Sequence, residues 1–318
     1  MKGLSYALGL IVSSTVVALS GVAHGQTIYG MTAVGSDSSA PGLGLVRFDA
    51  ATPGTIIPVG SFTGVVAGQS VRSIDFRPAN GLLYAISTFD SSAQLYTVDL
   101  NTAALTAVGS GFSLGTSTTA RVEMDFNPVA DRVRIVTGSQ ISPVTNSNYR
   151  VNPDTGALVA TDTNLNWNPG DPSAATNSVS IVGGAYTNNF PGSTSTTLYA
   201  WDFTTDDLVT IGGIGGTPSP NTGTMFTVAE ATSFLTGLAA LGMDIGPSSN
   251  TLFVTHDDPA NATLMSLYTR DLTTGAESLV GAYPAGVFIN DISVVIPEPA
   301  TASLLILGVA GLATRRRR

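Results

Sequence analysis

The sequence predicts an all-β protein, a five-bladed β-propeller built from four-stranded antiparallel blades. A motif of an apolar residue, an aspartate and a second apolar residue recurs at intervals of about 50 to 60 residues. An apolar strand and a hairpin follow each clear copy, which gives four short strands per unit. The first ordered strand and the last one complete a further unit and close the ring. An open β-sandwich and a six-bladed ring are the alternatives.

The recurring motif is predicted to form the first strand of each blade, which lines the central channel of a propeller. Its clear copies are Ile74-Asp75-Phe76, Met124-Asp125-Phe126 and Met243-Asp244-Ile245, and its faint copies are Gly184-Ala185-Tyr186 and Asn290-Asp291-Ile292.

Four aspartates, Asp75, Asp125, Asp244 and Asp291, are therefore expected at equivalent positions beside the channel. A buried carboxylate has to be hydrogen-bonded or paired with a cation. The expected partners are Arg72, Arg77, Arg121, Arg132 and Arg134. We favour structural pairing, because a catalytic pair need not recur in every blade. The alternatives are a channel cation site and a carboxylate pair for glycosidase-like acid–base chemistry.

Each hairpin joins a strand that ends in aspartate to an apolar strand through a turn of Asp, Asn, Thr, Pro and Gly. These residues supply side-chain caps and the positive φ of tight turns. The hairpins are Leu45–Asp49 with Ile56–Gly60, Leu95–Asp99 with Leu105–Gly109, Tyr149–Asp154 with Ala157–Ala160, and Leu267–Asp271 with Glu277–Gly281. No hairpin follows the last strand, Phe288–Val295, and no first strand precedes Thr27–Met31. Pairing of these two strands closes the ring.

The N-terminus has the pattern of a secretory signal peptide, residues 1–25. Lys2 precedes an apolar run from Leu4 to Leu19, and small residues follow up to Gly25. Signal peptidase is expected to cleave after Gly25, with cleavage after Ala23 and an uncleaved anchor as alternatives. The propeller then occupies residues 26–296.

Residues 297–318 form a distinct tail. It consists of Pro297, Glu298 and Pro299, an uncharged stretch from Ala300 to Thr314, and the cluster Arg315, Arg316, Arg317 and Arg318. This order resembles the PEP-CTERM sorting tail of Gram-negative bacteria. The resemblance implies transient membrane insertion, with the arginines in the cytoplasm, and cleavage by exosortase, which releases or re-anchors the body at the cell surface. A plain tail anchor is the alternative, and it too leaves the body outside.

Composition excludes several classes of partner. Between Gln26 and Ile296 there are eight arginines, no lysine and 21 acidic residues, so the net charge is near −13. Nucleic acids and anionic lipid surfaces bind basic faces, so neither is expected as a partner. The chain has no cysteine, so the exported domain depends on its own core for stability.

Two short patterns suggest chemistry that the rest of the chain does not support. Gly111-Phe112-Ser113-Leu114-Gly115 matches the nucleophile elbow of serine hydrolases, but no helix follows it. His256 is the single histidine of the mature body, which is too few for a histidine zinc site. We expect a loop at the first position and a surface turn at the second.

The segment between the third and fourth blades is the candidate binding loop. Its oxygen-bearing side chains alternate as in calcium loops, which predicts calcium as a cofactor. The predicted ligands are Asp162, Asn164, Asn166, Asn168 and Asp171. Trp167 at the tip is a candidate for stacking on a sugar ring. The alternative is an ordered loop of Asx turns without a ligand.

Several segments of the body occur in a fixed order: Phe48 to Gly54, Ile74 to Pro78, Met124 to Pro128 with Asp131 to Arg134, Asn152 to Gly156, and Ala185 to Asn188. In these segments the body resembles a bacterial family known as domain of unknown function 4394, over about residues 28 to 280. It departs from the family pattern at Gly242-Met243-Asp244-Ile245, where Gly-Phe-Asp-Ile is usual. The resemblance implies no activity and no catalytic residue.

Together these features predict an exported, non-enzymatic surface or extracellular-matrix protein. Its propeller is expected to present loops to extracellular polysaccharide, a partner protein or calcium. The alternative is an extracellular glycan lyase or hydrolase that uses carboxylates at the channel mouth. A propeller hosts both kinds of function, so the fold does not decide between them.

Overall fold

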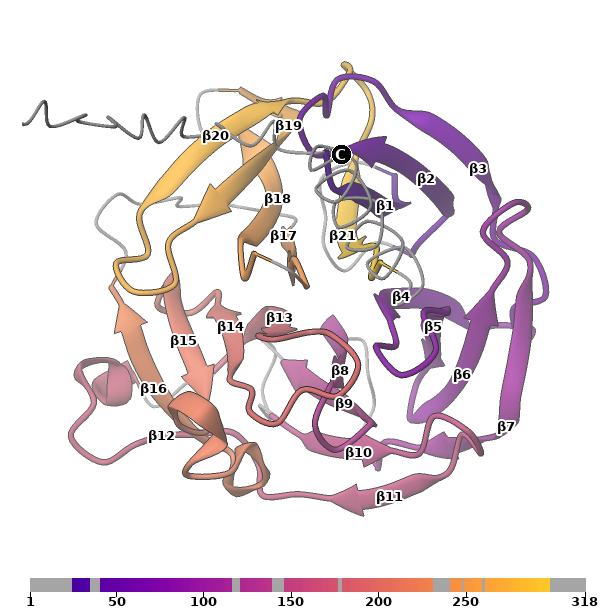
Figure 1. Cartoon of the computed structure of the whole chain (residues 1–318). Coiled ribbons are helices and arrows are strands. Elements are labelled where there is room, and N and C mark those ends of the chain that lie inside the picture. Colours follow the sequence, from indigo (N-terminus) through magenta and orange to yellow (C-terminus); the bar gives the residue numbers. More distant parts are fainter. Residues whose placement is uncertain are drawn as a thin grey trace, which may run out of the picture.

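The computed structural model describes residues 25–34, 41–115, 121–138, 146–176, 179–230, 241–247, 249–258 and 261–297. The signal-peptide prediction, apart from Gly25, and the tail prediction from Glu298 onwards lie outside these residues. The described strands form five small sheets arranged as blades around a channel, as Figure 1 shows. This confirms the five-bladed propeller.

Blades 1, 2 and 3 each have four antiparallel strands, ordered from the channel outwards. Blade 1 consists of β21 (Ile289–Val294), β1 (Thr27–Thr32), β2 (Gly44–Asp49) and β3 (Ile57–Ser61). Blade 2 consists of β4 (Ser70–Phe76), β5 (Leu83–Phe89), β6 (Ser92–Val98) and β7 (Leu105–Ser113). Blade 3 consists of β8 (Arg121–Asn127), β9 (Arg132–Gly138), β10 (Asn148–Val151) and β11 (Leu158–Thr161).

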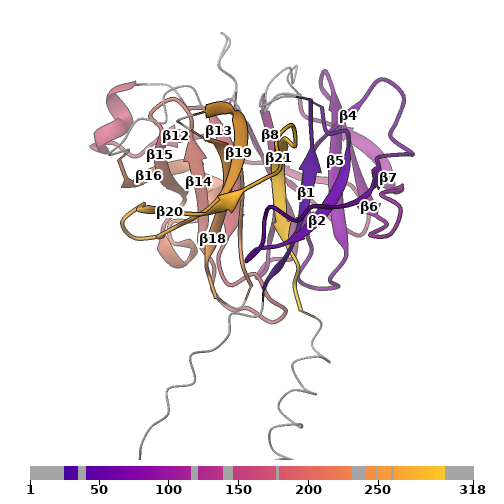
Figure 2. The ribbon, with the colours of Figure 1, turned by 90° about the horizontal axis from the view of Figure 1, so that it is seen from above.

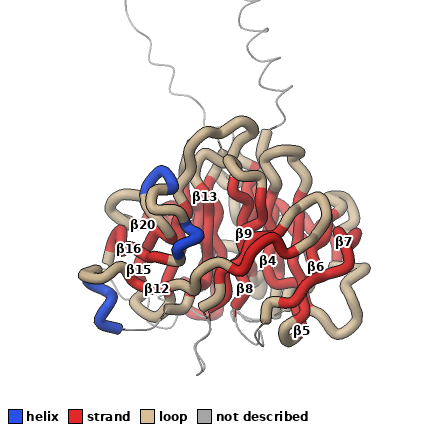
Figure 3. The backbone as a smooth tube through the Cα atoms, turned by 90° about the horizontal axis from the view of Figure 1, so that it is seen from below, coloured by secondary structure: helices blue, strands red, loops and turns tan. Residues whose placement is uncertain are grey.

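Blade 5 repeats this pattern and blade 4 extends it. Blade 4 consists of β13 (Ile181–Tyr186), β14 (Leu198–Asp202), β15 (Asp207–Ile211), β16 (Thr224–Ala229) and an added edge strand, β12 (Asn166–Trp167), parallel to β16. Blade 5 consists of β17 (Leu241–Ile245), β18 (Leu252–Asp258), β19 (Asn261–Arg270) and β20 (Glu277–Ala282). Three single-turn helices, η1 (Pro172–Thr176), η2 (Ile214–Gly216) and η3 (Pro220–Thr222), lie in the connections of blade 4 (Figure 3).

The ring is closed by pairing of the two ends of the propeller. Strand β21 lies antiparallel to β1, with Val294 opposite Ile28 and Ile292 opposite Gly30. The two strands run side by side in Figure 2. The predicted closure is therefore confirmed. It gives β1 a partner on each side, which removes a free sheet edge.

The core consists of apolar clusters, most of which lie between neighbouring blades; we call each such interface a seam. At the seam of blades 2 and 3, Tyr84 of β5 meets Phe126 of β8 edge to face, with ring centroids 5.0 Å apart. The same contact recurs at the seam of blades 1 and 2, where Tyr29 meets Phe76 at 5.7 Å. Burial of one such side chain stabilises the fold by about 1.5–3 kcal/mol.

The hairpin turns follow the predicted chemistry. Gly156 and Gly275, which end the outer turns of blades 3 and 5, have φ of +66° and +67°. A side chain at Gly156 would also meet the carbonyl oxygen of Val108, 2.0 Å from the position of its Cβ. Glycine is therefore required at this turn both by its backbone conformation and by its contact with blade 2. Among the described residues, no helix is long and apolar enough to cross a membrane.

Candidate functional site

Three carboxylates from three blades meet in the channel. Asp75 of β4, Asp125 of β8 and Asp244 of β17 each place an oxygen within 4.8 Å of the other two. Their side chains are buried, with exposed fractions of 1%, 4% and 1%. We call these three residues the channel carboxylates. They are the one group of three acidic or imidazole side chains close enough to hold a metal ion in the part of the chain that the structure describes.

Each channel carboxylate accepts a hydrogen bond from the backbone of another blade. Asp75 accepts from Phe126 N–H at 2.8 Å, Asp125 from Tyr186 N–H at 3.2 Å, and Asp244 from Val294 N–H at 2.6 Å. Asp75 and Asp244 also accept from the N–H of the residue that follows them. These carboxylates therefore join neighbouring blades at the inner strands, and the favoured structural interpretation agrees with the geometry.

The prediction that Asp291 is the blade 1 equivalent of Asp75 is wrong, because Ser293, two positions later, occupies that place. Asp75 lies opposite Tyr84 in its blade, and the residue opposite the corresponding Tyr29 is Ser293. Ser293 Oγ accepts from Phe76 N–H at 3.0 Å and so bridges the seam of blades 1 and 2 as the aspartates bridge theirs.

Asp291 belongs to a second layer of the channel. It lies opposite Met31 and is structurally equivalent to Ser73 and Glu123, which lie opposite the corresponding residues of β5 and β9. Asp291 accepts from Ile74 N–H at 2.7 Å, so this layer also bridges the seam of blades 1 and 2.

Three of the arginines predicted to pair with the channel aspartates, Arg77, Arg132 and Arg134, bond other groups. Arg77 pairs with Asp131 at 2.5 Å and Asp154 at 2.6 Å, and Arg134 pairs with Asp162. Arg132 donates to the Asp131 carbonyl. The guanidinium of Arg121 stacks on Phe203, and its charge acts to lower the pKa of Glu123.

Burial raises the pKa of the channel carboxylates. Burial raises the pKa of Asp244 to about 7, and burial together with the charge of Asp244 raises that of Asp75 well above its usual value. The pKa of Asp125 is raised likewise, by burial and by the charges of Asp75 and Asp244. These groups hold protons at a pH where an exposed aspartate has lost them.

The described hydrogen bonds give this donor set a structural role. Three carboxylates suit a hard cation such as calcium. Both oxygens of Asp75 and of Asp244, however, already accept hydrogen bonds from backbone N–H groups. Because the side chains are buried, a sugar has no access to them for acid–base chemistry. The arrangement fits bridging of the blades better than a cation site or a catalytic pair.

The predicted calcium ligands have separate partners. Asp162 is held by Arg134 and Arg150, whereas Asp171 accepts from Thr227 N–H at 2.8 Å and Thr227 Oγ1 at 2.7 Å. Between them, Asn166 belongs to β12, and Asn164 and Asn168 flank that strand. The described contacts do not gather these five side chains around one ion.

The proposed exposure of Trp167 and of His256 is wrong. Trp167 lies in β12 and is 8% exposed against the core of blade 4, because the segment adds an edge strand instead of protruding. His256 is fully buried in β18, stacked on Tyr268 with ring centroids 4.0 Å apart and with Nε2 3.0 Å from Glu277 Oε2. Ser113 lies in β7 of blade 2, whereas His256 lies in blade 5.

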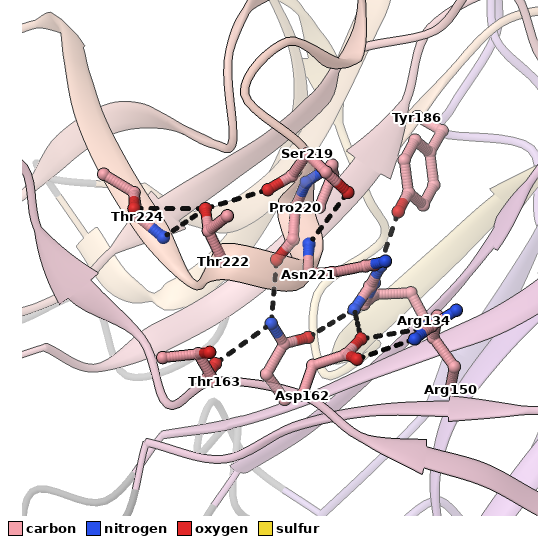
Figure 4. A network of polar contacts seen from close by, with 11 residues as sticks. Arg134, Arg150, Asp162, Thr163, Tyr186, Ser219, Pro220, Asn221, Thr222 and Thr224 are labelled. Atoms are coloured by element: carbon pink, nitrogen blue, oxygen red, sulfur yellow. Dashed lines mark hydrogen bonds and ion pairs between the residues drawn. The ribbon is translucent and has the colours of Figure 1, made fainter.

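A network of arginines at the seam of blades 3 and 4 is a site that the sequence did not reveal (Figure 4). Asp162 accepts from Arg134 Nη1 at 2.7 Å and from Arg150 Nε and Nη2 at 2.8 Å each. Arg134 Nη2 also donates to Asn221 Oδ1 at 2.6 Å. Burial opposes ionisation of Asp162, yet Arg150 and Arg134 hold its pKa below the usual value. The signal in the sequence was the clustering of arginines in a lysine-free, acidic body.

Two hollows adjoin this network. One, of about 130 Å³, is lined by Arg132, Arg134 and Arg150 together with Asn221. The other, of about 190 Å³, lies beside it, because Asn127, Ala130, Ser219 and Pro220 line both.

A larger pocket of about 600 Å³ lies between blades 4 and 5 and has no charged lining residue. Tyr199 and Phe226 form one wall, and both are in register with Thr210 of β15. Leu272, from the turn after β19, lies on the blade 5 side. These three hollows thus lie at seams between blades.

The chain is similar to several solved proteins. A GH43 glycoside hydrolase, engineered to display both endo-xylanase and exo-arabinofuranosidase activity, is 11% identical, with a TM-score of 0.51 over 83% of this chain and 53% of that one. A protein from Lactobacillus plantarum is 12% identical, with a TM-score of 0.42 over 85% and 99% of the two chains. TolB from Acinetobacter baumannii is 13% identical, with a TM-score of 0.39 over 81% and 53%. The chain spans about half the length of TolB and of the GH43 enzyme. The likeness to the GH43 enzyme, at this identity, shows the fold alone.

Comparison at the level of sequence is more specific. None of the curated proteins matches the chain. A family model described as "Domain of unknown function (DUF4394)" matches residues 44–293, which extend from β2 into β21 and so include most of the propeller. The chain belongs to the DUF4394 family.

Proposed function

We propose that this DUF4394 protein is a non-enzymatic binding protein whose propeller presents surface hollows to extracellular polysaccharide. The observation that carries the proposal is the state of the channel carboxylates, which are buried and hydrogen-bonded to the backbone of neighbouring blades. A glycan hydrolase or lyase needs groups that reach the substrate. The polar and apolar hollows at the seams, by contrast, are open to a ligand.

Export and processing are part of this proposal. The signal-peptide pattern of residues 1–25 supports export, and the tail supports cleavage by exosortase at the cell surface. The closing strand β21 ends at Val294 and the buried Ile296 follows it. A cut near Pro297 to Pro299 would therefore leave the ring intact, as surface release or re-anchoring of a folded body requires.

The test is co-sedimentation of residues 26–296 with extracellular polysaccharide from the bacterium that produces the protein. Parallel samples contain calcium or a chelator, and the polysaccharide is sized before and after incubation. The proposal expects retention of the protein with polysaccharide of unchanged size. Absence of binding in both samples would refute it, and a fall in polymer size would establish the enzyme alternative. Binding that is lost only in the sample with the chelator would identify calcium as a cofactor.

A further inference from the structure

The hollow lined by Arg132, Arg134 and Arg150, which we call the arginine hollow, stands out against the charge of the whole body. The propeller has eight arginines, no lysine and 21 acidic residues between Gln26 and Ile296. Three of those eight arginines line this single hollow of about 130 Å³. Ionised side chains repel like charges at this range, so the clustering has an electrostatic cost that a bound anion would remove.

The local charge is not balanced by the acidic residues around it. Asp162 is shared by Arg134 and Arg150. Among the described ion pairs, none includes Arg132, whose guanidinium donates to the Asp131 carbonyl at 2.7 Å. The carboxylates of Asp131 and Asp154 instead pair with Arg77. The pKa of Asp154 is lowered by its bond to Arg77 and also by the charge of Arg132. The four arginines Arg77, Arg132, Arg134 and Arg150 therefore meet three carboxylates, which leaves a surplus of one positive charge.

The guanidinium groups are held in place before any ligand binds. Arg150 bonds Asp162 through Nε and Nη2, and its Nη1 has no partner among the described residues. Its side chain is 29% exposed, so this nitrogen is within reach of solvent. Arg134 is buried and fixes Asn221. Since these side chains are already ordered, a ligand would bind with little additional loss of conformational entropy.

The chemistry around the arginines suits a sugar that carries a carboxylate. Guanidinium groups bind planar carboxylates through paired N–H donors. Asn127, Ser219 and Asn221 add amide and hydroxyl groups that suit sugar hydroxyls. Ligand pockets for drug-sized molecules are typically about 300–1,000 Å³. The smaller size of this hollow favours a single ring, and the adjoining hollow of about 190 Å³ offers space for a neighbouring unit.

We infer that the arginine hollow binds a uronic acid residue, through its carboxylate, within the polysaccharide proposed above. Arg132 and Arg150 supply the N–H groups that reach the carboxylate, and Arg134 with Asp162 positions Arg150. The inference rests on the proposed function for the source of the uronate. The site itself is tested with small molecules, which need no polysaccharide.

The first experiment is calorimetric titration of the protein with sodium glucuronate, glucose and inorganic phosphate. Glucuronate is expected to bind and glucose is not. Arg132→Gln is expected to weaken glucuronate binding by at least about tenfold, as loss of one charge-assisted hydrogen bond would. The matched control is Arg47→Gln, which removes the same charge from the exposed face of β2 and should leave binding unchanged. Binding of phosphate but not glucuronate would overturn the sugar assignment, and equal loss in both variants would overturn the site.

The folding of the variants is checked by thermal unfolding, because Arg150 also holds Asp162. Arg150→Lys keeps the charge but removes the paired donors, so it should unfold like the wild type and bind glucuronate more weakly. Binding equal to that of the wild type would refute the role of Arg150.

A second experiment separates this inference from the proposed function. Wild type and Arg132→Gln are co-sedimented with the polysaccharide and with the same polymer after chemical reduction of its carboxyl groups. Retention that falls on reduction and in the variant supports the inference. Equal retention of both proteins would refute the arginine hollow and leave the binding function standing. Glucuronate binding without polysaccharide binding would support the arginine hollow and refute the proposed function.

Discussion

Replacement of Asp125 by asparagine tests whether the channel carboxylates repel one another. In the wild type, the one described hydrogen bond of this side chain is the bond from Tyr186 N–H to Oδ1. An asparagine Oδ1 can accept the same bond, and its amide can donate to Asp75 or Asp244, which lie within reach. The variant therefore removes a charge without removing the bridge between blades 3 and 4.

The size of the effect follows from the spacing of the oxygens. Two unit charges 4.8 Å apart, the upper limit for these atoms, repel by about 3 kcal/mol at an effective dielectric constant of about 20. Repulsion of this sign acts in the cluster, because the charge of Asp244 adds to burial in raising the pKa of Asp75 and of Asp125. We expect Asp125→Asn to raise the free energy of unfolding by about 1–3 kcal/mol near pH 8.

The sign depends on pH. A carboxyl group whose pKa is raised by folding binds more protons in the folded state than in the unfolded one. For Asp244 this difference extends from about pH 4 to about pH 7, so wild-type stability falls as the pH rises through that window. Asp125→Asn should flatten this fall and change stability little near pH 5.

Urea unfolding followed by tryptophan fluorescence measures this, because both indole rings, Trp167 and Trp201, are buried. The control, Asp271→Asn, removes the same charge from an exposed turn and should not raise stability near pH 8. An equal gain in unfolding free energy in both variants would show that the effect comes from the net charge of the protein and not from repulsion in the channel. A wild type stabilised by added calcium near pH 8, with that gain lost in Asp125→Asn, would refute the reasoning, because a cation and not a proton would then neutralise the cluster.

Three further perturbations address other parts of the ring. His256 and Arg270 hold the pKa of Glu277 below its usual value although burial raises it, so its stabilisation is present above about pH 4.5 and is lost as the pH falls. Glu277→Gln should therefore lower the unfolding free energy by about 1–2 kcal/mol near pH 7 and have no effect near pH 3, as measured by urea unfolding. Arg77→Ala leaves two partly exposed carboxylates unpaired and should cost about 2 kcal/mol, seen as a melting temperature a few degrees lower in calorimetry; an unchanged temperature would contradict this. Deletion of residues 289–294 removes β21 and exposes the edge of β1, so size-exclusion chromatography should show aggregates; a compact monomer would argue against closure by this strand.

The ring and its closure were predictable because the signals for them are local. In each hairpin, the turn is determined by a few adjacent residues: Asp99 and Asp271 cap the N–H groups two and three residues ahead of them. The unmatched strands Thr27–Met31 and Phe288–Val295 are equally visible in the sequence, since each lacks a neighbour that the other provides.

Register and partner choice were not predictable from one strand at a time. A shift of two residues keeps every side chain on the same face of a strand, so the apolar pattern does not distinguish Asp291 from Ser293 as the equivalent of Asp75. The two residues are distinguished only by the pairing of Ser293 with Tyr29 in the neighbouring strand.

The environment of His256 likewise depends on other strands. Its acidic neighbours in the sequence suggested a surface turn, but Tyr268 and Glu277 from the next two strands enclose it. The arginine hollow combines residues from blades 3 and 4, more than 60 positions apart in the chain, so no sequence motif records it.

Blade 4 has Ala185 where blades 2, 3 and 5 have a channel carboxylate. At the seam that follows it, no carboxylate of blade 4 accepts the N–H of Ile245, which bonds Asp244 of its own blade instead. Among the described inner strands, the other four seams each have a side-chain oxygen that accepts a backbone N–H from the next blade. Hydrogen bonds are directional, whereas the apolar contact of Ala185, Met243 and Ile245 is not. Among the described residues, blades 4 and 5 are therefore held together by apolar contact along their inner strands and by the paired amides of Asn188 and Asn250 just beyond the strand ends.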